Sequence, residues 1–521
     1  MPKLTMFHHH QRGRVTNDAA AHTKMIRSLG CHEGYQLAIH TLDQYRGTIV
    51  SCRYTLPSSL THREALGTLK ARFYEAIAHV VLAQPHLQVG IVGENTKDPA
   101  FVCLDRLDFR NHVDWNTFND FNDLESQYSA SIQFQLDARY SHLATQPGWR
   151  VIVLHKVGAD YLEVLYVWNH PHHDGMSGKI FHEQLLQSLN GGAIQRNGND
   201  LVDKIQQDSD TWVLNLPDSS DTLPPPPEVL SPWPMSTAFL LKALWKELKP
   251  LSIFPASDTY ATWAPIQTTP YMTQYRTFVV DSDTVTKLAG VCHQNHTTLT
   301  GLFQALVLVS LTSAVEEAKG FASRTPYDLR HFLPSNIPAY PWLRPKESMC
   351  NYVSVIDHEF DAELVATIRS KISPEAAGAS LSADIMDVVW PVSARVRQEI
   401  KARLDSGINN DMIGIMKFVR DWRPQQLSEA QKPRYLSWLV TNLGVLDGEA
   451  SETQREEHWS IRRADLILSA EVPSAALSIS IMTVKDEQMC VTCTWQDCAV
   501  DTKVGERLMS DLERWLREIA S

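Results

Sequence analysis

The chain has 521 residues, of which 43% are hydrophobic and 21% charged, and it carries a net charge of -12. This length exceeds what one ordinary hydrophobic core holds, so the sequence predicts two domains or lobes. The acidic balance, with no basic run that contains interleaved aromatic residues, argues against a nucleic-acid-binding protein.

The sequence shows no recognisable targeting signal, and this and its cysteine usage favour a protein of the cytoplasm. The first 30 residues contain no apolar stretch of signal-peptide length, and no segment holds about 18 uninterrupted apolar residues, as a membrane span needs. The eight cysteines are scattered, which suits a reducing compartment. Cys490 and Cys493 form a CxxC pattern in the alternating run MCVTCTW, where positions three apart face opposite sides of a strand, so they are not predicted to bind zinc.

The first half of the chain alternates strand and helix patterns. Residues 47–56 (GTIVSCRYTL) predict a strand, and apolar residues at steps of three and four predict a helix from about residue 62, with Thr61 and Glu64 as a capping box. Residues 149–155 and 161–168 are nearly continuous apolar runs, typical of strands buried on both faces. Another helix is expected to start near Gly178.

The second half has the same style. TFVVD predicts a strand, HTTLTGLFQALVLVSL predicts a helix, and a C-terminal helix is expected from Asp501. Residues 216–240 are rich in proline, with four in a row from Pro224 to Pro227, which excludes helix or inner strand there. We therefore expect a first lobe at 1–215, a crossover at 216–240 and a second lobe at 241–521.

The two halves also share a short repeated pattern. YLEVLYVW is followed by NHPHHDGMSG and an amphipathic helix, and QMCVTCTW is followed by QDCAVDTKVG and an amphipathic helix. Each copy contains a strand that ends in tryptophan, a loop of about ten residues and a helix. The pattern predicts two lobes of related α/β architecture. Because only the first copy carries histidines, its polar cluster is an addition to a shared scaffold.

The cluster NHPHHDG, residues 169–175, allows three interpretations. Asparagine, histidine and aspartate are good turn residues and Gly175 suits a positive φ, so the segment can be a turn alone. His170, His172, His173 and Asp174 can also be metal ligands, although Pro171 interrupts the extended backbone that would point two rings the same way. In the third interpretation His170, at the end of a buried strand, is a general base, since an imidazole titrates near neutral pH.

His170-x-x-x-Asp174-Gly175 resembles the HxxxDG signature of the CoA-dependent acyltransferase superfamily. Further stretches resemble its fungal alcohol acetyltransferase-like group: IRSLGCHEGY, AQPHLQVGI, TPYDLRHFLP followed by Asn351, and WLVTNLG. The resemblance spans about residues 26–518. Asn169 stands where condensation domains have a second histidine, and the DFGWG motif of plant BAHD enzymes is absent from the sequence.

The resemblance implies a chloramphenicol-acetyltransferase-like fold, with two similar α/β lobes and a solvent channel between them. It implies that His170 is the general base and that Asp174 pairs with Arg330 of the second lobe, although Asp328 is another possible partner for Arg330. Thr441 and Asn442 are candidates for stabilising the oxyanion; alternatively, Asn442 caps a turn at a strand end.

The function implied is direct transfer of an acyl group, expected to be acetyl, from acyl-CoA to a hydroxyl of a small secondary metabolite. We expect no permanent cofactor, no metal and a monomer whose partners are acyl-CoA and the alcohol. Two alternatives stay open: a free-standing condensation-type enzyme that takes its acyl group from a carrier protein, and a degenerate binding protein of the same fold.

Overall fold

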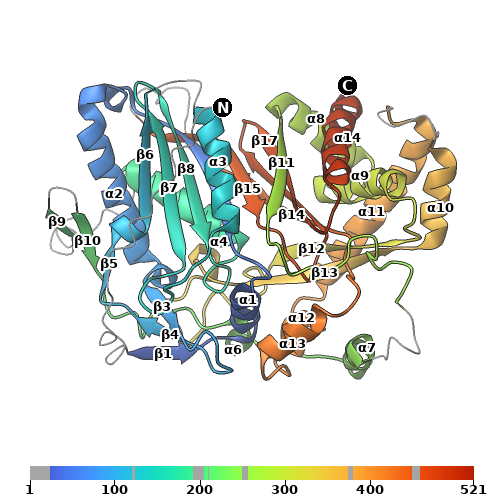
Figure 1. Ribbon diagram of the computed structural model, residues 1–521, viewed down its shortest axis with the longest axis horizontal. Coiled ribbons are helices and arrows are strands. Elements are labelled where there is room, and N and C mark those ends of the chain that lie inside the picture. The colour runs from blue at the N-terminus through green and yellow to red at the C-terminus, as the bar shows by residue number, and fades with distance from the viewer. Residues whose placement is uncertain are drawn as a thin grey trace.

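The computed structural model of the protein describes residues 24–119, 124–191, 205–208, 211–248, 256–372, 380–448 and 458–521. Two large sheets stand side by side, each with its own helices (Figure 1). The elements of the first half are β1 (Met25–Ser28), α1 (Cys31–Thr41), β2 (Thr48–Thr55), α2 (Leu66–Ala83), β3 (Val89–Val92), β4 (Ala100–Cys103), β5 (Arg106–Asp108), β6 (Val113–Phe118), α3 (Leu124–Asp137), β7 (Trp149–Lys156), β8 (Tyr161–Trp168), α4 (Gly175–Leu189), β9 (Ile205–Asp208) and β10 (Thr211–Asn215).

The elements after β10 form the second half. They are α6 (Pro227–Leu230), α7 (Thr237–Leu248), β11 (Thr273–Val280), α8 (Ser282–Gln294), α9 (Leu299–Ala314), β12 (Phe321–Asp328), β13 (Val353–Phe360), α10 (Ala362–Lys371), α11 (Ala383–Asp405), α12 (Met412–Met416), α13 (Trp422–Glu429), β14 (Trp438–Leu446), β15 (Ser460–Leu468), β16 (Leu477–Val484), β17 (Met489–Gln496) and α14 (Thr502–Ala520).

The first large sheet has five strands in the order β15-β2-β8-β7-β6. Its central strands β7 and β8 were predicted from their continuous apolar runs, and both are buried almost throughout. Side chains of α2 and α4 pack on one face of this sheet, while α3 packs on the other. Because helices cover both faces of the sheet, these strands lack an alternating pattern of polar and apolar residues.

The second large sheet has six strands in the order β11-β17-β16-β14-β12-β13. Helices α8, α9, α11 and α14 share one hydrophobic core with it. Helix α9 begins after Thr298, whose side chain caps the helix by accepting a hydrogen bond from Gly301 N, and α14 begins after Asp501 as predicted. The predicted fold class, α/β with two sheet-based lobes, is confirmed.

Strand β15 departs from the order of the chain. It lies after the predicted crossover at 216–240, yet it pairs antiparallel with β2 along its whole length, from Ser460 opposite Thr55 to Leu468 opposite Thr48. The strands that follow it, β16 and β17, return to the second sheet. The first sheet is therefore completed by a strand from the second half of the sequence.

The repeated pattern corresponds to equivalent packing in the two lobes. Trp168 ends β8, and a Cβ atom placed on Gly178 of α4 would lie 2.6 Å from its ring. Trp495 lies near the end of β17, and a Cβ atom on Gly505 of α14 would lie 2.7 Å from its ring. In both cases a glycine ten positions after the tryptophan lets the helix approach the indole closely.

Two expected helix starts were wrong. Helix α2 begins at Leu66, after a short 3-10 turn, and its N-cap is Ala65, so Thr61 and Glu64 do not form a capping box. Helix α4 begins at Gly175 rather than near Gly178, and Gly175 is not among the glycines with positive φ. A Cβ atom there would lie 3.0 Å from Leu443 Cδ2, so close packing, not backbone conformation, favours glycine.

The crossover predicted at 216–240 is packed against both halves. It is not free of helix as expected: α6 begins at Pro227, since the first turn of a helix tolerates proline, and α7 begins at Thr237. Pro224 to Pro227 are buried. The carbonyl of Pro224 accepts a hydrogen bond from Arg27, and that of Pro225 accepts one from the hydroxyl of Tyr352. Among the described residues no single helix is long and apolar enough to cross a membrane; only α8 and α9, bent by 89° at their junction, meet that length and composition together.

Candidate active site

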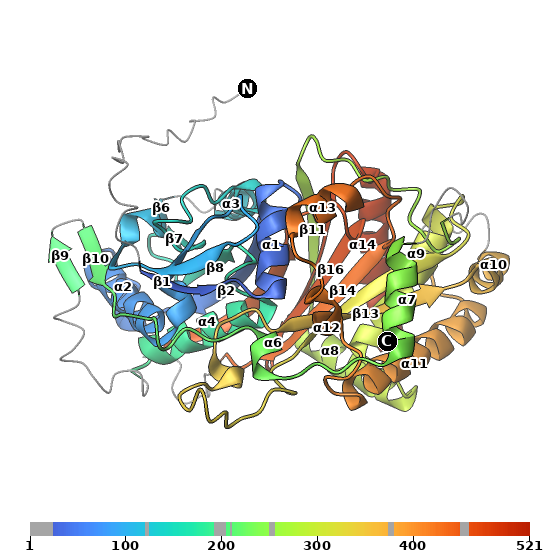
Figure 2. The ribbon, with the colours of Figure 1, turned by 90° about the horizontal axis from the view of Figure 1, so that it is seen from below.

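His170 lies two positions after the end of the buried strand β8 and is half-buried. The rings of His32 from α1 and of Tyr45 meet its imidazole edge-on, with centroids 6.1 and 5.9 Å away. Helix α1 lies between the two large sheets in both views (Figures 1 and 2). Burial lowers the pKa of His170, and a hydrogen bond with its own backbone carbonyl opposes that shift. The ring is thus neutral near pH 7, as a general base requires.

Asn351 connects the second half of the chain to His170. Its Nδ2 donates to the backbone carbonyl of His170 at 2.7 Å and lies 3.4 Å from His170 Nδ1. If Nδ1 carries the ring proton and donates to the same carbonyl, Nε2 is left with its lone pair. This tautomer would present Nε2 as the proton acceptor.

Asp174 is buried and accepts hydrogen bonds through both carboxylate oxygens. Oδ1 accepts from Ser177 N at 2.9 Å, which caps α4, and Oδ2 accepts from Tyr352 N at 2.8 Å. Arg330 donates to Oδ2 at 2.6 Å and to Oδ1 at 3.1 Å. Burial alone would raise the pKa of Asp174, but the Arg330 cation and these donors lower it below its ordinary value. Asp174 therefore stays ionised and cannot accept a proton from a reacting group.

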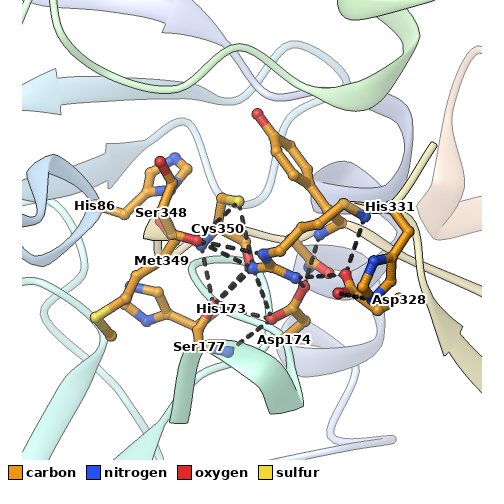
Figure 3. Close-up of polar contacts among 12 residues, drawn as sticks. His86, His173, Asp174, Ser177, Asp328, His331, Ser348, Met349 and Cys350 are labelled. Carbon is orange, nitrogen blue, oxygen red and sulfur yellow. Dashed lines mark hydrogen bonds and ion pairs between the residues drawn. The ribbon is translucent and has the colours of Figure 1, made fainter. Parts of the chain in front are cut away.

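Arg330 is only 1% exposed and contacts more than Asp174. It also donates to Asp328 Oδ1 at 3.0 Å, so both partners considered from the sequence lie within reach. Further bonds run to the carbonyls of Ser348 and Cys350, each at 3.2 Å. Figure 3 shows Asp174, Ser177, Asp328, Ser348 and Cys350 around this network of polar contacts. The network joins the loop after β8 to the segment that carries Asn351.

The backbone of residues 349–352 is held by the first half of the chain. Cys350 N donates to Ser177 Oγ at 2.9 Å, and Asp174 N donates to the carbonyl of Cys350 at 3.1 Å. Met349 N donates to Gln84 Oε1 at 2.9 Å. These contacts fix the backbone on both sides of Asn351, and so place its carboxamide at His170.

The neighbouring histidines point elsewhere. His172 packs against Gly148, where a Cβ atom would lie 2.7 Å from its Nδ1, and its ring lies beside Phe101. His173 Nδ1 lies 3.1 Å from the hydroxyl of Tyr166. Burial lowers the pKa of His172 to about 3 and that of His173 well below its ordinary value. Within the described ranges, no three His, Cys, Asp or Glu side chains are grouped as metal ligands would be.

Thr441 and Asn442 lie in β14 and are half-buried. Asn442 Oδ1 accepts from Gly444 N at 2.8 Å, and its Nδ2 lies 3.4 Å from Thr300 Oγ1. This is the turn-capping role that was the alternative to oxyanion binding. Leu443, two positions after Thr441, reaches Gly175 at the start of α4. Strand β14 therefore approaches the loop that carries His170.

The sequence did not identify His32 and Tyr45 as neighbours of His170. A signal for His32 was present in CHEGYQLAIHT, where His32 and Gln36, four residues apart, lie on one side of a helix. Both are buried, and polar residues on a buried helix face often belong to a site. Nothing in the local pattern of Tyr45 indicated its position.

Sequence comparisons relate the chain to alcohol acetyltransferases. A family model for alcohol acetyltransferases matches residues 108–340, a range that contains His170, Asp174, Gly175 and Arg330. The chain is 28% identical over 515 residues to a probable alcohol acetyltransferase, FCK4, of Fusarium pseudograminearum, with 95% of each chain covered. It is 24% identical to the probable alcohol acetyltransferase crmB of Aspergillus fumigatus, covering 95% of this chain and 100% of that one.

Solved structures show the same fold at low sequence identity. The trichothecene 15-O-acetyltransferase TRI3 from Fusarium sporotrichioides superposes with a TM-score of 0.65 and 14% identity, covering 94% of both chains. The first condensation domain of the calcium-dependent antibiotic synthetase superposes with a TM-score of 0.57 and 12% identity, covering 96% of both. The chain is therefore similar to alcohol acetyltransferases in sequence, and it has the fold that TRI3 and this condensation domain share.

Proposed function

We propose that the protein is an acyl-CoA-dependent O-acyltransferase that acetylates a hydroxyl of a small secondary metabolite, with His170 as general base. The observation that supports this most is the placement of His170. It is a half-buried, neutral imidazole at the end of β8, held through its carbonyl by Asn351 from the other half of the chain. Relatives named as alcohol acetyltransferases support the choice of acetyl group and alcohol.

The proposed reaction needs no covalent intermediate on the enzyme. His170 Nε2 accepts the proton of the acceptor hydroxyl, while the oxygen of that hydroxyl attacks the thioester carbonyl of acetyl-CoA. The tetrahedral intermediate collapses, the carbon–sulfur bond breaks, and the CoA thiolate takes the proton back from His170. The products are the acetate ester and free CoA. A thiolate leaves readily, because the pKa of a thiol is only about 8.5.

The oxyanion of the intermediate requires a hydrogen-bond donor. We propose Thr441 for this role rather than Asn442, because the carboxamide of Asn442 already serves Gly444 and Thr300. Asp174 and Arg330 act through position: they hold the loop after β8 against residues 349–352. The two substrates would then reach His170 from opposite sides of a channel between the lobes.

The test uses free acetyl-CoA, a panel of small alcohols and release of the CoA thiol. His170→Ala should lower turnover by about 10²- to 10⁴-fold, the range for a lost general base, and leave the melting temperature nearly unchanged. His172→Ala and His173→Ala should act chiefly on the melting temperature, because both rings are buried away from that of His170. If the His170 variant kept more than about a tenth of wild-type turnover, general-base catalysis by this residue would be wrong.

A condensation-type enzyme would behave differently in the same assay. It would transfer the acyl group from the phosphopantetheine arm of a carrier protein and leave free acetyl-CoA unused. A binding protein of this fold would release no thiol from either donor. An enzyme that prefers acetyl-CoA over acetylated carrier protein supports the proposed function.

A further inference from the structure

Helix α1 brings a pair of polar side chains to His170 that the proposed reaction does not use. His32 and Gln36 lie one helical turn apart, and Gln36 Nε2 is 3.2 Å from His32 Nε2. Their residues are only 9% and 7% exposed. Within the part of the chain that the structure describes, neither His32 Nδ1 nor Gln36 Oε1 has a hydrogen-bond partner. Leaving such atoms buried and unpaired costs free energy.

The pair offers both a donor and an acceptor, whichever way the carboxamide is turned. If Gln36 donates to His32 Nε2, the ring proton is on Nδ1, and Nδ1–H and Oε1 are unpaired. If the carboxamide is flipped, Nε2 of His32 donates to it, and Nδ1 becomes an acceptor while the NH₂ group is free to donate. A hydroxyl group, which donates and accepts, satisfies either arrangement.

The pair lies close to His170, where the hydroxyl of the acceptor would bind. The His32 ring meets that of His170 at 65° with centroids 6.1 Å apart, and it stacks on Tyr35 at 6.0 Å. Tyr35 and His170 are both partly exposed, so solvent reaches the residues on either side of His32. A group next to a hydroxyl bound at His170 would therefore lie close to His32.

We propose that His32 and Gln36 bind a second hydroxyl or carbonyl group of the acceptor, next to the hydroxyl that is acetylated. The substrate class is then a polyfunctional alcohol, such as a diol or hydroxyketone, and simple aliphatic alcohols are poor acceptors. This inference rests on the proposed function. A site built to hydrogen-bond a polar group discriminates against the analogue that lacks it, since its own buried groups are then left unpaired.

The experiment compares matched acceptors in the acetyl-CoA assay: cyclohexanol, the vicinal cyclohexanediol and the corresponding hydroxycyclohexanone. Wild-type kcat/KM should favour the bifunctional compounds by roughly tenfold or more, the worth of one hydrogen bond and its unpaired partner. Gln36→Met and His32→Leu, which keep the apolar shape but not the polar atoms, should bring the three acceptors to similar values.

His40→Leu is the matched control. His40 lies on the same helix and is also buried, but its ring packs against Tyr140. This variant should keep the wild-type preference, and melting temperatures identify any variant that has lost its fold, in which case the other variant decides. Equal wild-type values for all three acceptors, or a preference that survives both substitutions, would show that the pair binds only water. Absence of transfer to any alcohol would instead overturn the proposed function and this inference with it.

Discussion

The carboxamide of Asn351 donates to the backbone carbonyl of His170 across 2.7 Å, and this contact joins residues 181 positions apart. The bond holds the backbone of the proposed base rather than its ring. The same Nδ2 also lies 3.4 Å from Nδ1 of the His170 ring, so one carboxamide contacts both the backbone and the imidazole. Asn351 is therefore a positioning residue in the proposed reaction.

Substitution of Asn351 should change turnover and its pH dependence in separable ways. Asn351→Ala removes one hydrogen bond and should lower kcat by up to about tenfold. The acid limb of its pH–rate profile should not move to higher pH. Asn351→Asp adds a carboxylate close to His170, which favours the imidazolium and should move the acid limb of kcat/KM to higher pH. A limb that stayed in place in the aspartate variant would show that Asn351 supports only the fold.

Arg330→Ala should lower both stability and activity. It leaves the carboxylate of Asp174 buried without its cation, and breaking one partner of such a pair costs about 3–5 kcal/mol. Denaturant unfolding measures this loss, and Arg330→Lys should recover part of it, since lysine keeps the charge but not the paired donors.

Lys401→Ala is the control for Arg330. It removes an ion pair to Asp405 in which both side chains are exposed, at 70% and 62%, and should cost less than about 1 kcal/mol. If the two alanine variants had equal stability, Arg330 would contribute no more than a surface charge.

Gly178→Ala and Gly505→Ala should destabilise the protein to a similar extent. Each would place a Cβ atom within 2.7 Å of a buried tryptophan ring, and forcing extra volume into a packed core costs about 1–3 kcal/mol. Gly290→Ala in α8 is the control, because a Cβ atom there meets no described atom within 4 Å. It should stabilise by about 0.5–1 kcal/mol, the helix preference of alanine over glycine. If one of these two substitutions left the stability unchanged, the packing around the two tryptophans would not be equivalent.

Stability should fall steeply as the pH drops below about 6.5, the ordinary pKa of histidine. Burial lowers the pKa of His32 and His172 to about 3, and that of His40, His86, His112 and His182 to about 4. In this window the unfolded chain binds protons that the folded chain does not, so the free energy of unfolding rises with pH. Each histidine contributes up to about 1.4 kcal/mol per pH unit between about pH 6.5 and 4.

Proton uptake on unfolding at pH 5 measures this effect directly. The exposed His142 is a control: His142→Gln should leave the pH dependence of the melting temperature unchanged. A melting temperature that stayed level between pH 7 and 5 would contradict protonation of these buried rings on unfolding.

Local patterns predicted those elements whose burial has one simple period. Strands β7 and β8 and helices α9 and α14 were found where apolar runs or steps of three and four placed them. The start of α2 was missed because a 3-10 turn precedes it. In the sequence, the residues around such a turn can look like a capping box. The pairing of β15 with β2 was missed because no local period encodes the partner of a strand.

The site was predictable in part for the same reason. His170, Asp174 and Arg330 lie in motifs that the sequence displays, so a resemblance could name them. His32 and Tyr45 reach His170 only because α1 lies between the two sheets, which is a property of the whole fold (Figure 2). Leu443 likewise explains Gly175 through a contact between residues 268 positions apart.

The position of β15 at the edge of the first sheet has a consequence for biosynthesis. While the ribosome is still making the second half, β2 has no partner on one side, and its free N–H and C=O groups can pair with another chain. The sheet is complete only once residues 460–468 have left the exit tunnel, when most of the protein has been made. A nascent chain stalled before this point should be a client for chaperones that bind exposed strands, and a fragment ending at residue 215 should aggregate unless a peptide of residues 458–470 is supplied.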